Sequence, residues 1–334
     1  MANITAEDEA NTVKTEILHY ISSAPGGVSI FLAALNIVLA IVATLGNFLL
    51  LIALRKVISI YPPTKLFFRS LAVTDLFAGL IVQPMYSITL IPGISHKNLM
   101  YYSIQVTGIS GSILCTVSIL TSTAISVDRL LALLLGLRYK QVVTLKRTRA
   151  VVGCIWLLSC SMGGWRYSNW GAEVSKFTLF VLMLLSLIIS ICSYTKIYLY
   201  LQNQQAQLHA KKHREIHQEP TSNGGEGRLN IERYKKLVSS IAWVQLALLL
   251  CFIPFTVGSM LFTHRKLTGV ATGIAHFCVS IPYVLFNPAL NPILYCWKIR
   301  EVKQAMKETV RKLNCYFKSS WSFFPSSITN TTRA

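Results

Sequence analysis

The residues best suited to chemistry are an adjacent acid and base, Asp128 and Arg129, which close a long apolar run. Charged groups are costly in hydrocarbon, so such a pair either marks a membrane boundary or carries a function. Neighbouring side chains on a helix point about 100° apart, so Asp128 cannot occupy every guanidinium donor, and Arg129 keeps donors for another helix or a docked protein. Arg129 is therefore a candidate switch contact. The alternative, that the pair only ends a membrane helix, stays open at this point.

A second costly group is Asp75, near the middle of the apolar segment FFRSLAVTDLFAGLIVQP. A carboxylate at that depth should face other helices and have polar partners, so a functional role is the default interpretation. The oxygen-bearing side chains at compatible depth are Asn47, Ser118, Asn287 and Asn291. Together with Asp75 they could hold a hydrated cation, with Na⁺ the obvious one. The alternative is a water-filled hydrogen-bond network around a protonated Asp75.

Prolines mark the points where apolar helices can bend, because each removes a backbone hydrogen bond and frees a carbonyl group. They are Pro84, Pro254, Pro282, Pro288 and Pro292. A bend at Pro254 would make a hinge for the inner half of its helix. Tyr194 and Tyr295 lie near the inner ends of two other segments, where their hydroxyl groups could meet Arg129 or water in one conformation.

Apolar segments of membrane length fill most of the 334 residues, of which 53% are hydrophobic and only 13% charged. This composition indicates a bilayer protein. We predict an all-α membrane protein, a seven-helix bundle with spans at about 29–54, 66–91, 99–135, 150–164, 174–201, 237–262 and 270–297. The net charge of +19 does not indicate nucleic-acid binding, because the Lys and Arg residues lie between apolar segments of membrane length.

Lys and Arg collect on one side of the predicted membrane, in three alternate loops and after residue 298. The positive-inside rule then places the N-terminus outside and the C-terminus in the cytoplasm of a multi-pass plasma-membrane protein. The predicted parts are an outer tail (1–28), the membrane domain (29–297) with a polar inner loop at about 203–232, an amphipathic helix (298–314) and a cytoplasmic tail (315–334).

Two modification sites and one lipid contact follow from this orientation. Asn3 opens an outer Asn-Ile-Thr sequon for glycosylation. The predicted helix at 298–314 should lie on the lipids of the inner leaflet through one apolar face. That face consists of Ile299, Val302, Met306, Val310 and Leu313. Cys315, at the end of this helix, suits palmitoylation.

The sequence carries no signature of an enzyme, since it shows no metal-ligand cluster, nucleophile elbow or phosphate-binding glycine loop. Its eight cysteines lack the close paired spacing of a disulfide framework or a zinc site. A transporter or channel should show internal repeats or a polar path through several helices, and neither is evident.

One motif per predicted helix, in a fixed order, links the chain to a known family. The motifs are Gly46-Asn47, Leu71-Ala72-Val73-Thr74-Asp75, Asp128-Arg129-Leu130, Trp156, Tyr194, Cys251-Phe252-Ile253-Pro254 and Asn291-Pro292-Ile293-Leu294-Tyr295. The series resembles that of rhodopsin-like (class A) G-protein-coupled receptors over about residues 36–315. Ile104 replaces the usual cysteine of the third helix and Ser186 the usual proline of the fifth, which is similar to melanocortin, cannabinoid and lysophospholipid receptors. The segment LRYKQVVTLKRTRAVVGCIWLLS is most similar to adenosine receptors, so the chain resembles a divergent member of that combined cluster.

The resemblance implies a receptor that signals to a heterotrimeric G protein when its sixth helix swings outward, with arrestin and a receptor kinase as further partners. Its switch residues would be Asp128, Arg129, Tyr194, Asn291, Pro292 and Tyr295, its toggle and hinge Phe252 and Pro254, and its sodium pocket Asp75, Ser118, Asn287 and Asn291. Tyr234 stands where many members carry an acid that locks onto the arginine, and Glu232 is off register. We therefore hypothesise elevated basal activity.

The implied ligand pocket is small, apolar and weakly hydrogen-bonding. It comprises Thr107, Gly111, Ser112, Cys115, Phe255, Ser259, Phe277 and Ile281. Gly111 replaces the aspartate of amine receptors, and the seventh segment has no lysine for a retinal Schiff base. A lipid or neutral small molecule fits best, and an adenosine-like or melanocortin-like ligand less well. The remaining alternatives are a receptor-like protein that only assembles with other receptors and, with less support, a membrane transporter.

Overall fold

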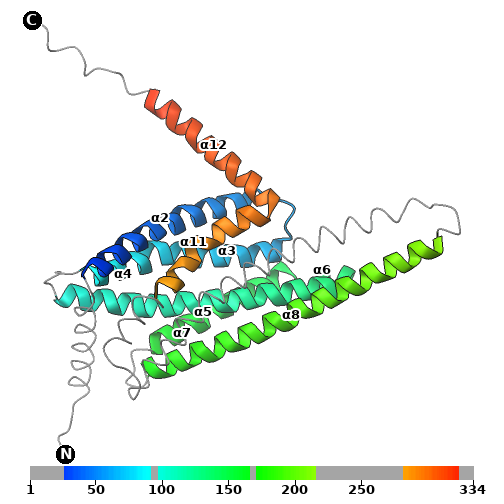
Figure 1. Cartoon of the computed structure of the whole chain (residues 1–334), viewed down its shortest axis with the longest axis horizontal. Coiled ribbons are helices and arrows are strands. Elements are labelled where there is room, and N and C mark those ends of the chain that lie inside the picture. Colours follow the sequence, from blue (N-terminus) through cyan, green and yellow to red (C-terminus); the bar gives the residue numbers. More distant parts are fainter. Residues whose placement is uncertain (1–25, 92–96, 166–170, 216–280, 323–334) are drawn as a thin grey trace, which may run out of the picture.

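The structure, a computed structural model, describes residues 26–91, 97–165, 171–215 and 281–322, nearly all of them helical. The helices are α2 (Gly26–Lys56), α3 (Pro62–Phe77), the π-helical η1 (Ala78–Val82), α4 (Gln83–Leu90), α5 (Lys97–Leu135), the 3₁₀ turn η2 (Gly136–Arg138), α6 (Tyr139–Val142), α7 (Leu145–Trp165), α8 (Gly171–Glu215), α11 (Ile281–Lys298) and α12 (Arg300–Ser322). Figure 1 shows the long helices side by side, with α12 leaving the bundle at one end.

Four described segments are long and apolar enough to cross a membrane: Gly26–Lys56, Pro62–Leu90, Asn98–Val142 and Phe177–Gln204. They contain the first and third predicted spans and cover nearly all of the second and fifth. The fourth predicted span falls within α7, and α11 holds the C-terminal part of the seventh. The sixth, 237–262, lies outside the described residues.

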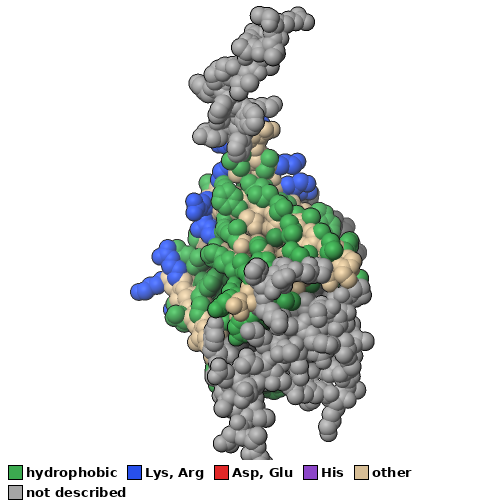
Figure 2. Space-filling view, turned by 90° about the vertical axis from the view of Figure 1, so that its left-hand side faces the viewer, with side chains coloured by type: hydrophobic (Ala, Val, Ile, Leu, Met, Phe, Trp, Pro, Cys, Tyr) green, Lys and Arg blue, Asp and Glu red, His purple; other side chains and the backbone are tan. Residues whose placement is uncertain are grey.

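Helix α5 occupies the middle of the described bundle, since it packs against α3, α4, α7 and α8, while α2 packs against α3, α4, α11 and α12. The largest apolar core lies where α2, α3, α11 and α12 meet and includes Leu54, Phe68, Leu71, Tyr295 and Val302. The outer faces of the helices are hydrophobic as well. Viewed end-on, most of the described surface is hydrophobic, and no acidic side chain is visible (Figure 2). Helices whose outer faces are hydrophobic are suited to lipid as their solvent.

Two glycines allow α2 to approach its neighbours closely. A Cβ on Gly79, in η1, would lie 2.7 Å from Thr44 Oγ1, and a Cβ on Gly46 would lie 2.7 Å from Pro292 Cγ. The second approach also solves a hydrogen-bonding problem. Pro292 has no N–H, which leaves the Pro288 carbonyl without its partner one turn later in α11. Asn47 Nδ2 donates to that carbonyl at 2.9 Å.

Helix α12 extends to Ser322, eight residues beyond the predicted end of the amphipathic helix at 314. Its predicted lipid face is divided between two environments. Ile299 and Val302 are buried in the core shared with α2, with Met306 packed at its edge, whereas Val310 and Leu313 are exposed. The first turns of α12 are therefore attached to the bundle, and only the later apolar positions remain for lipid.

Candidate functional site: the inner polar network and the buried Asp75 cluster

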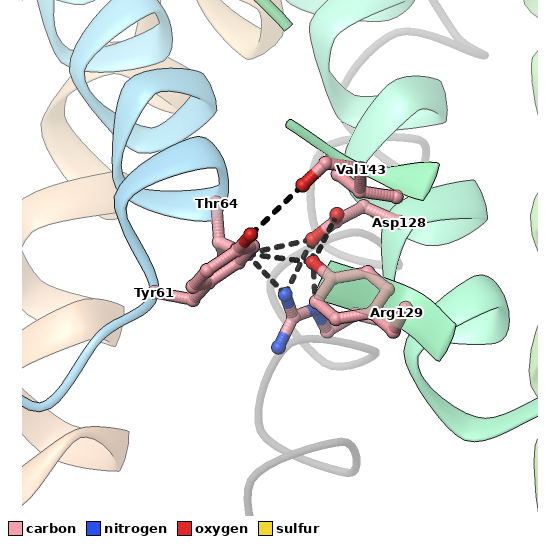
Figure 3. A network of polar contacts seen from close by, with 6 residues as sticks. Tyr61, Thr64, Asp128, Arg129 and Val143 are labelled. Atoms are coloured by element: carbon pink, nitrogen blue, oxygen red, sulfur yellow. Dashed lines mark hydrogen bonds and ion pairs between the residues drawn. The ribbon is translucent and has the colours of Figure 1, made fainter. Parts of the chain in front are cut away.

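Asp128, near the C-terminal end of α5, is the centre of a polar network that joins three helices (Figure 3). Thr64 Oγ1 on α3 donates to its Oδ2 at 2.8 Å, and the Tyr139 hydroxyl on α6 donates to its Oδ1 at 2.6 Å. Asp128 is 3% exposed, so a buried charge is matched by several donors. The carboxylate thereby fixes the positions of α3 and α6 relative to α5.

Arg129 lies in the same network, and its side chain is also buried. Its Nε donates to Asp128 Oδ2 at 3.2 Å, its Nη2 forms an ion pair with the same oxygen, and Nη2 also contacts Thr64 Oγ1. As adjacent helical positions require, Asp128 does not occupy the whole guanidinium, which reaches a second helix. In this arrangement α5 and α3 hold Arg129 beside Asp128.

Tyr61 adds a contact between the connection α2–α3 and the segment that follows α6. Its hydroxyl donates to the Val143 carbonyl oxygen at 2.9 Å, and its ring lies 5.3 Å from that of Tyr139. Tyr139 therefore contacts Asp128 with its hydroxyl and Tyr61 with its ring. Sequence reasoning missed Tyr61, Thr64 and Tyr139, because helix periodicity does not indicate which residues of different segments meet.

Tyr194 and Tyr295, the two predicted switch tyrosines, pack against different helices. Tyr194 on α8 packs, together with Leu130 and Leu133 of α5, against the small apolar cluster of Ile197 and Leu201. Tyr295 on α11 is buried, with its ring 5.2 Å from that of Phe68. Tyr194 thus faces the helix that carries Arg129, and Tyr295 packs in the apolar core.

Asp75 lies in a buried polar cluster between α3 and α11. Asn291 Nδ2 donates to Asp75 Oδ2 at 2.6 Å, and Asn287 is buried one turn earlier. Ser118, on α5, directs its hydroxyl to Thr74 Oγ1 at 3.2 Å rather than to Asp75. Of the predicted partners, Asn291 contacts Asp75 directly, whereas Ser118 contacts Thr74, the residue before Asp75.

The cluster contains oxygen atoms that lack a partner. Among the described residues, Asn47 Oδ1 and Asn291 Oδ1 are buried and accept no hydrogen bond. An unpaired carbonyl oxygen in an apolar interior is costly, and carbonyl and carboxylate oxygens are the ligands of hard cations. The residues present therefore fit Na⁺. No group of three His, Cys, Asp or Glu suited to other metals occurs in the described part of the chain.

The N-terminal half of α5 carries four of the predicted pocket residues. Cys115 packs with Phe180 and Met183 of α8, and Gly111 faces Val82, whose Cγ1 would lie 3.8 Å from an added Cβ. Ser112 donates to the Ile109 carbonyl within its own helix at 2.8 Å. Thr107 Oγ1 is buried without a partner among the described residues. The surface is thus apolar with few free polar atoms.

Several predicted residues are not placed. Asn3, Phe252, Pro254, Phe255, Ser259 and Phe277 lie outside the described residues, as do Glu232 and Tyr234, and the side chain of Ile281, which begins α11, is not described. Cys315 is an exposed free cysteine in α12.

Comparison with known proteins places this geometry in context. The chain is 23% identical over 319 residues to adenosine receptor A2b of Gallus gallus, covering 84% of this chain and 88% of the relative. It is 23% identical over 307 residues to adenosine receptor A3 of Ovis aries, covering 85% and 90%.

A solved structure supports the fold. The crystal structure of squid rhodopsin matches with a TM-score of 0.73 at 18% identity, covering 87% of each chain. The profile of the family described as "7 transmembrane receptor (rhodopsin family)" matches residues 46–167 and 160–295, most of the chain. This chain therefore belongs to the rhodopsin family of seven-transmembrane receptors, the class A G-protein-coupled receptors, which are signalling receptors and not enzymes.

Proposed function

We propose that this receptor transmits the binding of an extracellular neutral small molecule or lipid to a heterotrimeric G protein, by outward movement of its sixth helix. The observation that carries the proposal is the position of Arg129, held by Asp128 and Thr64 at the inner end of the bundle. An arginine kept in polar contacts that can be exchanged is suited to a two-state switch.

In the proposed orientation the N-terminus is outside and the inner network faces the cytoplasm, because Lys and Arg concentrate at that end. Activation would exchange the contacts of Arg129 with Asp128 and Thr64 for contacts with the G protein. Tyr194, which packs beside Leu130 and Leu133 of α5, would take part in the exchange. Asn291, Pro292 and Tyr295 would transmit the change along α11.

The proposed ligand follows from the described wall of the pocket. Gly111 and Cys115 offer no charge, and the Ser112 hydroxyl donates its hydrogen bond to a carbonyl of its own helix. Thr107 Oγ1 offers a single hydrogen-bonding atom. Such a wall suits a ligand that gains affinity from apolar contact. Adenosine is the second candidate, favoured by the similarity to relatives named adenosine receptors.

Na⁺ is proposed to bind in the Asp75 cluster. Asp75, Ser118, Asn287 and Asn291 would hold the ion, with Asn47 nearby. The ion would supply a positive charge that stabilises the buried carboxylate and satisfies the unpaired amide oxygens. Its binding would favour whichever conformation keeps the cluster together.

The test compares cAMP in cells that express the wild type or Arg129→Ala at equal surface level, first without ligand and then with lipid and nucleoside panels. A change in cAMP in cells with the wild type that Arg129→Ala abolishes supports the proposal. The panel that produces the change, lipid or nucleoside, shows whether the ligand is a lipid or adenosine. If Ca²⁺ and arrestin readouts are silent as well as cAMP, the receptor-like partner protein becomes the better proposal. Arrestin and a receptor kinase remain proposed partners of the cytoplasmic tail.

A further inference from the structure

Two basic residues occupy the outward-facing side of α3 near its inner end. Lys65 and Arg69 are only partly buried, as is Val73 one turn further on, and the same stripe continues to the exposed Phe77 and Leu80. Residues on the other faces of α3, such as Phe68 and Leu71, are buried. Lys65 and Arg69 therefore lie on the side of the helix that faces lipid.

These side chains reach the end of α2. Lys65 Nζ donates to the Val57 carbonyl oxygen, and Arg69 Nη2 lies 3.4 Å from the Leu54 carbonyl oxygen. Both contacts satisfy carbonyls that a helix C-terminus leaves unpaired. Arg69 Nε is nevertheless buried with no hydrogen-bond partner in the described structure. One long hydrogen bond leaves most donors of this guanidinium unused.

No carboxylate among the described residues balances the charge of this region. Helix α2 itself ends in Arg55 and Lys56, and Lys56 Nζ contacts the neutral Thr309 hydroxyl at 2.8 Å. Within the described ranges the one ion pair is Arg129–Asp128, so no described carboxylate pairs with Arg55, Lys56, Lys65 or Arg69. The dipole of a helix C-terminus supplies only about half a negative charge against these four cations. Capping of α2 therefore does not account for them.

Lys65 and Arg69 also repel each other. They are four residues apart on one face, and the charge of Arg69 acts on Lys65. An anion bound between them would relieve this repulsion.

The depth of Arg69 fits a lipid headgroup. It follows the first residue of α3 by seven positions, which is about 10 Å along a helix. A long basic side chain at this depth extends toward the interface, where lipid phosphates lie. Val73, Phe77 and Leu80 continue the stripe as an apolar surface suited to an acyl chain.

We propose that Lys65 and Arg69, close to the basic end of α2, bind the phosphorylated headgroup of an anionic inner-leaflet phospholipid where α3 meets the end of α2. The guanidinium and ammonium groups form charge-assisted hydrogen bonds with phosphate oxygens, which a zwitterionic headgroup matches less well. The inference rests on the proposed function for one point, the placement of this end of the bundle in the cytoplasm.

The test measures lipid binding to the purified full-length receptor by native mass spectrometry and thermal melting. Detergent-solubilised protein is titrated with phosphatidylinositol 4,5-bisphosphate, phosphatidylserine or phosphatidylcholine. The variants are Arg69→Gln, Lys65→Gln and the charge-preserving Arg69→Lys. The matched control is Lys146→Gln, which removes an exposed charge on α7, across the bundle from α2.

We expect the wild type to bind the bisphosphate lipid at least about fivefold more tightly than phosphatidylcholine. Arg69→Gln and Lys65→Gln should lose most of this preference. Arg69→Lys and Lys146→Gln should retain it. Equal binding of all three lipids, or an unchanged preference in Arg69→Gln, would overturn the proposal. The same stabilisation by soluble inositol phosphate would overturn the lipid as its source. Because no G protein or agonist is present, a failure of signalling leaves this result unaffected.

Discussion

The hydroxyl of Tyr61 donates a 2.9 Å hydrogen bond to the backbone carbonyl oxygen of Val143 and joins two connections that are 82 positions apart in the chain. Its ring simultaneously contacts Tyr139, whose hydroxyl is bound to Asp128. Tyr61 therefore holds from outside the same segment that Asp128 holds from within. The segment 136–143 is fixed at two points, and the loss of one should be measurable.

Tyr61→Phe keeps the ring contact and removes only the hydrogen bond. We expect faster amide hydrogen exchange over residues 136–143 and a loss of about 1 kcal/mol of stability, because the Val143 carbonyl loses its donor. Tyr198→Phe is the matched control, since the exposed Tyr198 hydroxyl only accepts from Gln202 on the same helix. Equal exchange in both variants would show that the hydrogen bond does not restrain the segment.

Thr64→Val tests the restraint on Arg129. The substitution keeps the shape of the side chain but removes the acceptor for Arg129 Nη2 and a donor to Asp128. Arg129 should leave its resting position more readily, so ligand-independent signalling should rise severalfold above wild type at equal surface expression. The measurement is basal cAMP or G-protein activation.

The control for this experiment is Thr89→Val. Thr89 is also buried, and its hydroxyl donates only to the Tyr86 carbonyl of its own helix. Basal signalling that rises equally in both variants would indicate a general effect of removing a buried hydroxyl group. Unchanged signalling in Thr64→Val would show that Asp128 alone holds Arg129.

The sequence predicted which helices form and which charged residues lie inside them. Apolar length indicated the spans, and the cost of a buried carboxylate drew attention to Asp75 and to Asn291, which is its hydrogen-bond partner. Asp128 and Arg129 were found by the same argument. These features depend on local composition and on depth in the membrane, both of which can be read along the chain.

Contacts that depend on the approach of two helices were not predictable in this way. Asn47 was expected to serve Asp75, yet its amide donates to the Pro288 carbonyl that Pro292 leaves unpaired. Ser118 likewise donates to Thr74. Tyr295 packs on Phe68. Each outcome is set by which partner lies nearest after packing, and a single sequence does not encode that distance.

Na⁺ should stabilise the wild type through the Asp75 cluster. An ion that binds only the folded protein raises its melting temperature in proportion to the logarithm of its concentration once binding saturates. We expect the melting temperature to rise as NaCl increases from about 10 to 150 mM at constant ionic strength, with N-methylglucamine as the replacement cation. Asp75→Asn keeps an acceptor for Asn291 but lacks the charge, and should abolish the dependence.

KCl provides the ion control for this experiment. A larger cation of equal charge screens surface charges to the same extent, so a specific site should favour Na⁺. Equal effects of Na⁺ and K⁺ on the wild type, or a Na⁺ effect that persists in Asp75→Asn, would contradict the proposed site and favour a network of water molecules.

The contact between Gly46 and Pro292 gives a prediction about stability. A Cβ on Gly46 would lie 2.7 Å from Pro292 Cγ, and the proline ring cannot rotate away as a flexible side chain would. Gly46→Ala should therefore push α2 away from α11 and lower stability by about 1–3 kcal/mol, measured by thermal melting. Gly153→Ala in α7 is the matched control. A Cβ there would have nothing within 4 Å, so the higher helix propensity of Ala should leave stability unchanged or raised.

A double-mutant cycle with Pro292→Ala separates this clash from a general effect on α2. Replacing the ring removes Pro292 Cγ, the atom closest to an added Cβ on Gly46, and leaves residue 292 Cβ at 3.1 Å, so the cost of Gly46→Ala should be smaller in the Pro292→Ala background. Pro292→Ala also restores an N–H that competes with Asn47 for the Pro288 carbonyl. This competition changes stability by itself. Its contribution cancels within the cycle if Gly46→Ala does not affect Asn47. Additive effects would show that Gly46 and Pro292 act independently, and that some other contact of α2 sets the distance to α11.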